Sequence, residues 1–160
     1  MIGDFIKYCS GLSERTGANQ INPLLPIFSE LWPFIENVLS EFIYNDDIVE
    51  YACRLVKHSQ RALGNQFLPF LHPFLRKAML GYKQNPLGTF VYAVEFCFAE
   101  FCHQPQHNDM FIEALDYIIK TSSEVLVSKD VCEQNPDLIN DIFGMAMRYV
   151  RYNKTLFFSS

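Results

Sequence analysis

Apolar residues recur along the chain at the three-to-four-residue spacing of amphipathic helices, and few segments alternate with a period of two. Helix breakers separate these segments at regular intervals, near Gly17, Asn22-Pro23, Asn45-Asp46, Gly64, Asn85-Pro86, Gln104-Pro105, Asn135-Pro136 and Asn153. The pattern predicts helices over residues 2–10, 23–42, 47–63, 66–82, 87–102, 108–128 and 136–151. It predicts no strand, so the expected fold class is all-α.

Residues 47–63 form the clearest amphipathic segment. Asp47 followed three residues later by Glu50 resembles a capping box, and Gly64 follows the segment at the position of a helix C′ residue. A broad apolar stripe is expected to face the core, with members Ile48, Val49, Ala52, Cys53, Leu55, Val56 and Leu63. The polar side carries Glu50, Arg54, Lys57, His58 and Arg61.

A second clear helix start lies near the C-terminal end of the sequence. Asn135 suits the N-cap position, Pro136 suits the first helical position, and Asp137 is favoured by the helix dipole. The basic residues Arg148 and Arg151 lie near the other end of this helix.

An internal repeat organises the helices into pairs. The run Leu31-Trp32-Pro33-Phe34 recurs 40 residues later as Leu71-His72-Pro73-Phe74. A period of about 40 residues is typical of HEAT arrays, in which hairpins of two helices stack into an α-α superhelix. We therefore expect repeats at 21–64, 65–104 and 105–152, the end of a preceding repeat at 1–20 and a following element at 153–160. The chain would then be a segment of a longer solenoid.

Composition excludes several classes of protein. The 160 residues are 49% apolar and 15% aromatic, which is enough to build a core and argues against disorder. A net charge of −5 disfavours nonspecific binding to nucleic acid or to anionic membranes. The longest apolar stretch, residues 87–102, contains Glu95 and Glu100 and is too short to span a bilayer, so no membrane segment is predicted.

Enzymatic and metal chemistry are not expected. The five cysteines contain no C-x-x-C pair and are predicted to be reduced core thiols. Cys97, Cys102, His103 and His107 lack the spacing that holds a tetrahedral metal, and neighbouring Cys102 and His103 point apart on a helix. The glycines are isolated, so no phosphate-binding loop is predicted. We therefore expect no cofactor.

One surface constellation stands out, and it is basic. Arg54, Lys57 and Arg61 lie at positions i, i+3 and i+7 of the segment 47–63 and form one row, with His58 beside it. Two interpretations remain open: a solvated helix face, or a docking row in which guanidinium groups bind phosphate or carboxylate. The aromatic residues Phe67, Phe70, Phe74, Phe96 and Phe98 are interpreted as core rather than as a peptide groove.

Several of these segments, taken in order, resemble a known family. They are Trp32-Pro33-Phe34, Asn45-Asp46-Asp47-Ile48-Val49-Glu50 with Cys53-Arg54, Gly64, and Asn135-Pro136-Asp137 with Asp141, Phe143 and Arg148-Tyr149-Val150. Over most of residues 21–158 the chain is similar to the C-terminal half of the transportin-SR group in the importin-β karyopherin superfamily. Tyr51 and Asp47 stand where the family pattern is basic.

The resemblance implies a noncatalytic nuclear transport receptor found in both nucleus and cytoplasm. In this group the helix corresponding to residues 47–63 contacts phosphorylated Arg/Ser-rich domains of splicing factors. Arg54, Lys57, Arg61 and His58 are therefore the expected cargo-binding residues.

The expected partners are protein cargo, Ran GTPase through parts of the protein outside this segment, and nucleoporins, with no direct contact to nucleic acid or membrane. An exportin and a HEAT scaffold without a transport role are the alternatives, and in either case the basic row would be inert surface.

Overall fold

The computed structural model describes residues 21–152, and within that range every regular element is helical. The elements are α3 (Leu24–Glu41), α4 (Asp46–Leu63), η2 (Gly64–Phe67), α5 (Leu68–Gln84), α6 (Gly88–Phe101), η3 (Pro105–His107), α7 (Asn108–Val125), α8 (Lys129–Gln134) and α9 (Pro136–Tyr152). The prediction of an all-α fold built from helical hairpins is confirmed. The helix predicted over residues 2–10 lies outside the described residues.

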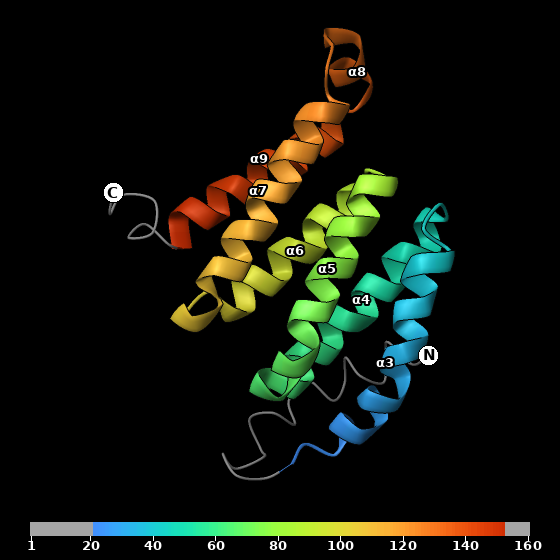
Figure 1. The fold of residues 1–160 in the computed structure, drawn as a ribbon, viewed down its shortest axis with the longest axis vertical. Helices are drawn as coiled ribbons and strands as arrows, with labels where there is room; N and C mark the ends of the chain where they lie inside the picture. The colour runs from blue at the N-terminus through green and yellow to red at the C-terminus, as the bar shows by residue number, and fades with distance from the viewer. Residues whose placement is uncertain (1–20, 153–160) are drawn as a thin grey trace. The chain divides into compact units, whose positions relative to one another are not determined.

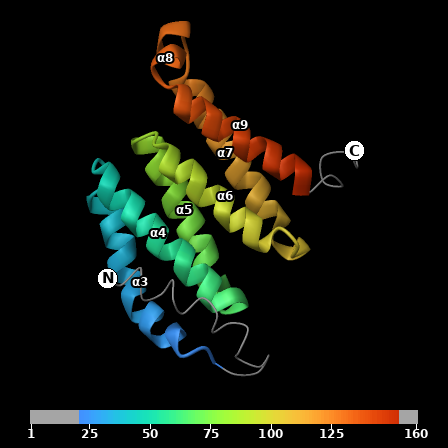
Figure 2. The ribbon, with the colours of Figure 1, turned by 180° about the vertical axis from the view of Figure 1, so that it is seen from behind.

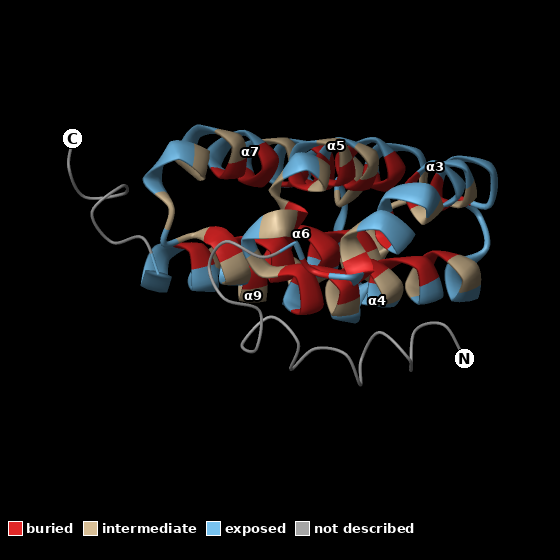
Figure 3. Ribbon diagram, turned by 90° about the horizontal axis from the view of Figure 1, so that it is seen from below, coloured by how far each residue is buried: buried red, intermediate tan, exposed pale blue. Residues whose placement is uncertain are grey.

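The chain divides into two compact units, Met1–Lys77 and Ala78–Ser160, with the boundary inside α5. In the first unit, α3 and α4 form a hairpin and lie side by side in both views (Figure 1 and Figure 2). Their buried residues face one another across the hairpin (Figure 3).

Aromatic side chains fill the interior of the first unit. Phe28 of α3 contacts Phe67 of η2 with ring centroids 5.7 Å apart, and Trp32 contacts Phe70 of α5 at 5.4 Å. Phe67 and Phe74 are fully buried, which confirms the interpretation of these rings as core. Aromatic pairs at such distances add stability beyond the area they bury.

The ends of α4 are set by local side-chain and backbone chemistry. Asn45 is the N-cap, because its side chain accepts a hydrogen bond from the backbone N–H of Ile48 at 3.1 Å. The predicted capping box at Asp47 and Glu50 is therefore wrong. Gly64 is the C-cap of the helix, one position before the C′ position predicted for it, and its φ of 55° is a conformation that glycine adopts without steric cost.

Asn22 ties the start of α3 to the end of α4. It is buried, and its side-chain amide donates to the carbonyl of Ala62 at 2.7 Å. Its backbone N–H donates to Oε1 of Gln66 at 2.9 Å, while its Oδ1 accepts from the N–H of Leu24 at 3.0 Å. One buried amide therefore satisfies backbone groups at both helix ends.

The repeat predicted from sequence places its two prolines inside helices. Pro33 lies within α3 and Pro73 within α5. Each of these helices is followed by a second long helix, α3 by α4 and α5 by α6. One neighbour of each proline is buried, Trp32 beside Pro33 and Phe74 beside Pro73, and this packing offsets the backbone hydrogen bond that each proline removes. The boundaries of the individual repeats remain a prediction.

In the second unit α6 contacts both α7 and α9, and α9 runs along it (Figure 2). Nine of the fourteen residues of α6 are buried, among them Glu95. Gly81 of α5 lies against the ring of buried Phe90, where an added Cβ would come within 2.5 Å of Cζ. The hydroxyl groups of Tyr82 and Ser122 share a buried hydrogen bond of 2.7 Å between α5 and α7.

The last part of the chain differs from the prediction in one element. The helix expected over 108–128 ends at Val125, and the short helix α8 follows before α9 begins at Pro136 as predicted. Ser128 caps α8 by accepting a hydrogen bond from Val131 N–H at 3.4 Å. Six residues are too few for a periodic pattern to be visible in the sequence.

Candidate functional site

The predicted basic row lies on the side of α4 opposite its core contacts. Val49, Cys53 and Val56 are buried on the core side. Arg54 and Arg61 are exposed, whereas Lys57 and His58 are half-buried. The structure therefore places all four predicted residues on one helix, with the two arginines as the most accessible cations of the row.

Arg54 is already engaged by a neighbour on its own helix. Its Nη2 forms an ion pair with Oε1 of Glu50, one turn earlier, and the two side chains are 60% and 45% exposed. An exposed pair at this spacing contributes less than about 1 kcal/mol, because water and salt screen it. The i, i+4 spacing of Glu50 and Arg54 in the sequence indicates this ion pair. The sequence analysis instead places Glu50 in a capping box.

The exposed face of α4 is divided by charge. Its first turns carry Asp46, Asp47 and Glu50, and its later turns carry the basic row. Acidic residues near a helix N-terminus and basic residues near its C-terminus both complement the macrodipole. The same division presents carboxylates and guanidinium groups to solvent on one helix.

The core side of α4 holds the face in place and is chemically inert. Burial raises the pKa of the Cys53 thiol to about 12, and the carboxylate of Glu50 acts in the same direction. A thiol with this pKa stays protonated at neutral pH and is a poor nucleophile. Cys53 therefore acts as an apolar core residue.

A second arginine site joins two helices of the second unit. Nη1 of Arg148 in α9 and Oε1 of Glu95 in α6 form an ion pair at 2.5 Å, and the Glu95 side chain is only 10% exposed. The ring of Tyr149, next to Arg148, stacks on Phe98 with centroids 3.7 Å apart and planes at 12°. These contacts fix α9 on α6.

The cysteine and histidine side chains between residues 97 and 107 are dispersed. Cys97 is buried inside α6, Cys102 caps the end of that helix, and His103 is exposed in the following turn. Burial raises the pKa of Cys102. Within residues 21–152 no three His, Cys, Asp or Glu side chains are arranged to hold a metal ion.

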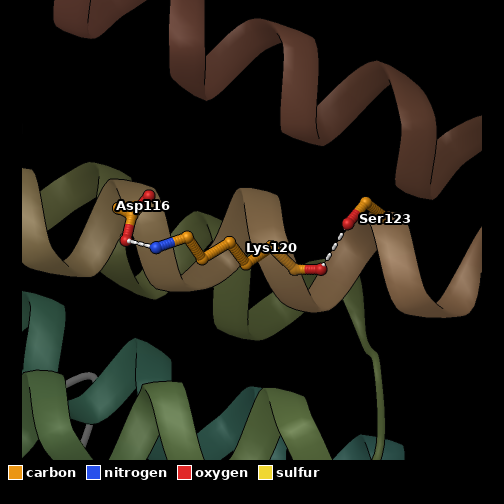
Figure 4. Close-up of polar contacts among 3 residues, drawn as sticks. All are labelled: Asp116, Lys120 and Ser123. Atoms are coloured by element: carbon orange, nitrogen blue, oxygen red, sulfur yellow. Dashed lines mark hydrogen bonds and ion pairs between the residues drawn. The ribbon is translucent and has the colours of Figure 1, made fainter.

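The remaining polar contacts on α7 are local. Lys120 Nζ donates to Oδ2 of Asp116 at 2.6 Å, and Ser123 Oγ donates to the Lys120 carbonyl at 2.7 Å (Figure 4). All three residues lie on one helix face, as is usual for a solvated helix surface. None of the described helices is long and apolar enough to cross a bilayer.

Helical hairpins that bury apolar faces against one another, with a charged helix face left to solvent, define the class of α-hairpin repeat proteins. Members of this class act as surfaces for binding other macromolecules. The sequence match is more specific: the model of the Transportin-3/Importin-13 fourth TPR domain matches residues 22–126, from the start of α3 to the end of α7. The chain belongs to this family of karyopherins.

Individual relatives agree with the family match. Importin-13 of Gallus gallus is 21% identical over 139 residues, which cover 87% of this chain and 14% of the relative. Importin-13 of Homo sapiens and of Mus musculus are each 21% identical over 136 residues, covering 85% of this chain and 14% of the relative. The chain thus corresponds to a small part of the length of these relatives.

Proposed function

We propose that this chain is a cargo-binding segment of a nuclear transport receptor of the transportin-SR kind, and that the exposed face of α4 binds protein cargo. Membership of the Transportin-3/Importin-13 family supports the assignment to a nuclear transport receptor. The observation that carries the choice of site is the exposure of Arg54 and Arg61 on one side of a helix whose opposite side is buried. The proposed cargo carries phosphorylated Arg/Ser-rich segments.

The chemistry of the row suits phosphate. Arg54 and Arg61 are seven residues apart, so their α-carbons are separated by about 10 Å along the helix, at a rise of ~1.5 Å per residue. A phosphoserine carries about −1.5 to −2 charges and accepts bidentate hydrogen bonds from a guanidinium group. It can displace the Glu50 carboxylate from Arg54, because the exposed Glu50–Arg54 pair is weak.

The acidic first turns of α4 form the second part of the proposed cargo-binding face. Asp46 and Asp47 are exposed beside the basic row and can bind the arginines of the same cargo segment. A ligand of alternating charge would then bind in one direction along α4. Such complementarity raises the rate of association and the specificity more than the affinity, and salt weakens it.

Further functions are proposed for the whole receptor, of which this chain is a segment. It includes movement between nucleus and cytoplasm, contacts with nucleoporins, and cargo release by Ran GTPase bound through repeats outside these 160 residues. Because the chain spans 14% of the importin-13 relatives, these properties are assigned only to the longer protein.

Fluorescence anisotropy of a labelled Ser-Arg repeat peptide tests the site. We expect the phosphorylated peptide to bind this chain, the unphosphorylated peptide to bind at least about tenfold more weakly, and both affinities to fall between 50 and about 200 mM salt. Replacing Arg54, Lys57 and Arg61 together by alanine should abolish phosphate-dependent binding.

A matched variant separates the row from net charge. Arg76, Lys83 and Lys129 lie outside α4, and their replacement by alanine removes the same three positive charges. This control should bind the phosphopeptide as the parent does. Equal losses in the two triple variants would show a nonspecific charge effect, and binding by neither peptide would favour the exportin or scaffold alternative.

A further inference from the structure

The exposed face of α4 carries one large aromatic side chain between its acidic and its basic part. Tyr51 is 69% exposed, on the side of the helix opposite the buried residues Val49 and Cys53. Residues of this face follow one another at intervals of four, three, four and three positions, which places them in one line along the helix: Asp47, Tyr51, Arg54, His58 and Arg61. The neighbours of Tyr51 in this line are therefore Asp47 on one side and Arg54 on the other.

Asp47 and Tyr51 together have the composition of a site for a guanidinium group. One helical turn separates the two residues, so their β-carbons lie about 5–6 Å apart on the surface. A guanidinium group stacks flat on a tyrosine ring, within about 6 Å of the ring centroid, and its N–H groups then donate to a carboxylate beside the ring. Asp46 lies in the same first turn of α4 and adds to the negative potential that attracts a cation.

Arg54 does not repel a cation from Tyr51, because its own charge is compensated. In the free protein Arg54 pairs with Glu50. In the proposed complex a cargo phosphate replaces the Glu50 carboxylate and brings about −1.5 to −2 charges against the single positive charge of Arg54. The released Glu50 carboxylate lies one turn from Asp47, so phosphate bound at Arg54 strengthens the neighbouring site for a cation.

We infer that Tyr51 and Asp47 form a subsite of α4 that binds an arginine side chain, with the guanidinium group stacked on the Tyr51 ring and hydrogen-bonded to the Asp47 carboxylate. The inference rests on the proposed function for the source of this arginine, a phosphorylated Arg/Ser-rich cargo segment. The subsite selects arginine over lysine, because an ammonium group is a compact, strongly hydrated charge without a flat surface to stack. Since carboxylates attract both cations, Tyr51 determines this specificity.

A double-mutant cycle with the phosphorylated Ser-Arg repeat peptide tests the role of Tyr51, by fluorescence anisotropy on the whole chain. A peptide with lysine in place of every arginine should bind the parent at least about threefold more weakly, and this preference should largely disappear in Tyr51→Leu. Tyr51→Phe keeps the ring and should retain the preference. Tyr152→Leu is the matched control, because it removes an exposed ring of α9, and it should behave as the parent.

The carboxylate of the subsite is tested with the same peptides. Asp47→Asn should weaken binding of the arginine peptide severalfold and reduce its dependence on salt. Asp130→Asn is the control for net charge and helix position, because Asp130 is an exposed acid in the first turn of α8. This variant should bind as the parent does.

A second measurement separates the subsite from the proposed function. The probe is L-argininamide, which carries a guanidinium group and no phosphate, titrated into the whole chain with isotope-labelled tyrosine rings. The NMR resonances of the Tyr51 ring, assigned by their absence in Tyr51→Phe, should shift saturably. L-lysinamide should shift them less, and the resonances of the Tyr152 ring should not move.

The two measurements distinguish the possible failures. Phosphopeptide binding that depends on Arg54 but is unchanged in Tyr51→Leu, with no shift of the Tyr51 ring, would overturn the subsite and leave the proposed function intact. A saturable shift of the ring in a chain that binds no phosphopeptide would support the subsite and refute its proposed cargo. Equal shifts with L-argininamide and L-lysinamide would overturn the subsite, because charge alone would then account for binding.

Discussion

Helices α4 and α9 each use an arginine–glutamate pair, but the two pairs have different surroundings. Arg54 and Glu50 are neighbours on α4, and both side chains are about half exposed or more. Arg148 and Glu95 come from α9 and α6, and Glu95 is nearly buried. The outward faces differ as well, since α4 presents charge and α9 presents Phe143 and Met147.

The difference in exposure between the two pairs distinguishes an arginine that can bind a ligand from one that stabilises the fold. A charge that remains in water keeps its hydration and can exchange its partner for a ligand at low cost. A carboxylate removed from water depends on the groups that compensate its charge, so its pairing becomes part of the fold. We therefore interpret Arg54 as available to a ligand and Arg148 as structural.

The largest expected effect concerns the pair between α6 and α9. Arg148→Ala removes the guanidinium from the buried Glu95 carboxylate and should lower the free energy of unfolding by about 2 kcal/mol. Urea denaturation of the whole chain, followed by circular dichroism, measures it. Adding Glu95→Gln to this variant should recover part of the loss, and a change below about 0.5 kcal/mol would show that water replaces the guanidinium.

A smaller effect of opposite sign is expected at the neighbouring tyrosine. The Tyr149 hydroxyl is buried without a hydrogen-bond partner among the described residues, and burial raises its pKa well above the usual range. Tyr149→Phe keeps the stack on Phe98 and should raise the free energy of unfolding by about 1 kcal/mol.

Tyr82→Phe is the matched control for this prediction. The Tyr82 hydroxyl shares a hydrogen bond with Ser122, so its removal should lower the free energy of unfolding by about 1 kcal/mol. Both values come from the same urea titrations. If Tyr149→Phe also lowers stability, its hydroxyl is satisfied by a bound water and the contrast between the two tyrosines disappears.

On α4 the expected change in stability is smaller still. Arg54→Ala removes an exposed ion pair and should change the free energy of unfolding by less than about 0.5 kcal/mol. The same substitution should clearly weaken phosphopeptide binding. A loss of stability comparable to that of Arg148→Ala would contradict the assignment of Arg54 to ligand binding.

Local signals in the sequence were sufficient for much of the fold. Gly64 marks the end of α4 because few other residues adopt its φ of 55°, and Pro136 begins α9 because its missing N–H is unneeded there. The apolar stripe of residues 47–63 gave the correct core side of α4. These features depend on neighbours within a few residues, so a single sequence contains them.

Features that depend on tertiary packing were not predictable. The pairing of Glu95 with Arg148 joins positions far apart in the sequence, and only the docking of α9 on α6 brings them together. The anchoring of Asn22 on Ala62 is of the same kind. The cap of α4 was misassigned for another reason: Asn45, Asp46 and Asp47 are all suitable N-cap residues, and backbone geometry selects among them.

The smallest expected effect distinguishes the acids of the two helices. Asp46 and Asp47 are exposed on α4, whereas Asp141 of α9 lies against Gly88 at the start of α6. Burial raises the pKa of the Asp141 carboxyl above its ordinary value of 3.8, and the nearby charge of Asp137 raises it further. A raised pKa means that the folded state holds this proton more tightly than the unfolded state.

The stabilisation from this proton is therefore complete below pH 3.8 and is lost as pH rises through the pKa of the folded protein. Asp141→Asn removes this dependence of stability on pH. The melting temperature of the variant minus that of the parent should therefore increase as pH rises over this window and stay constant at neutral pH. Thermal melts at closely spaced pH values measure it, with Glu113→Gln on the exposed side of α7 as the control that should follow the parent. A lead for Asp141→Asn that shrinks with rising pH would mean that the Asp141 carboxylate is favourably held at the start of α6, and that α9 uses its acids at helix ends as α4 does.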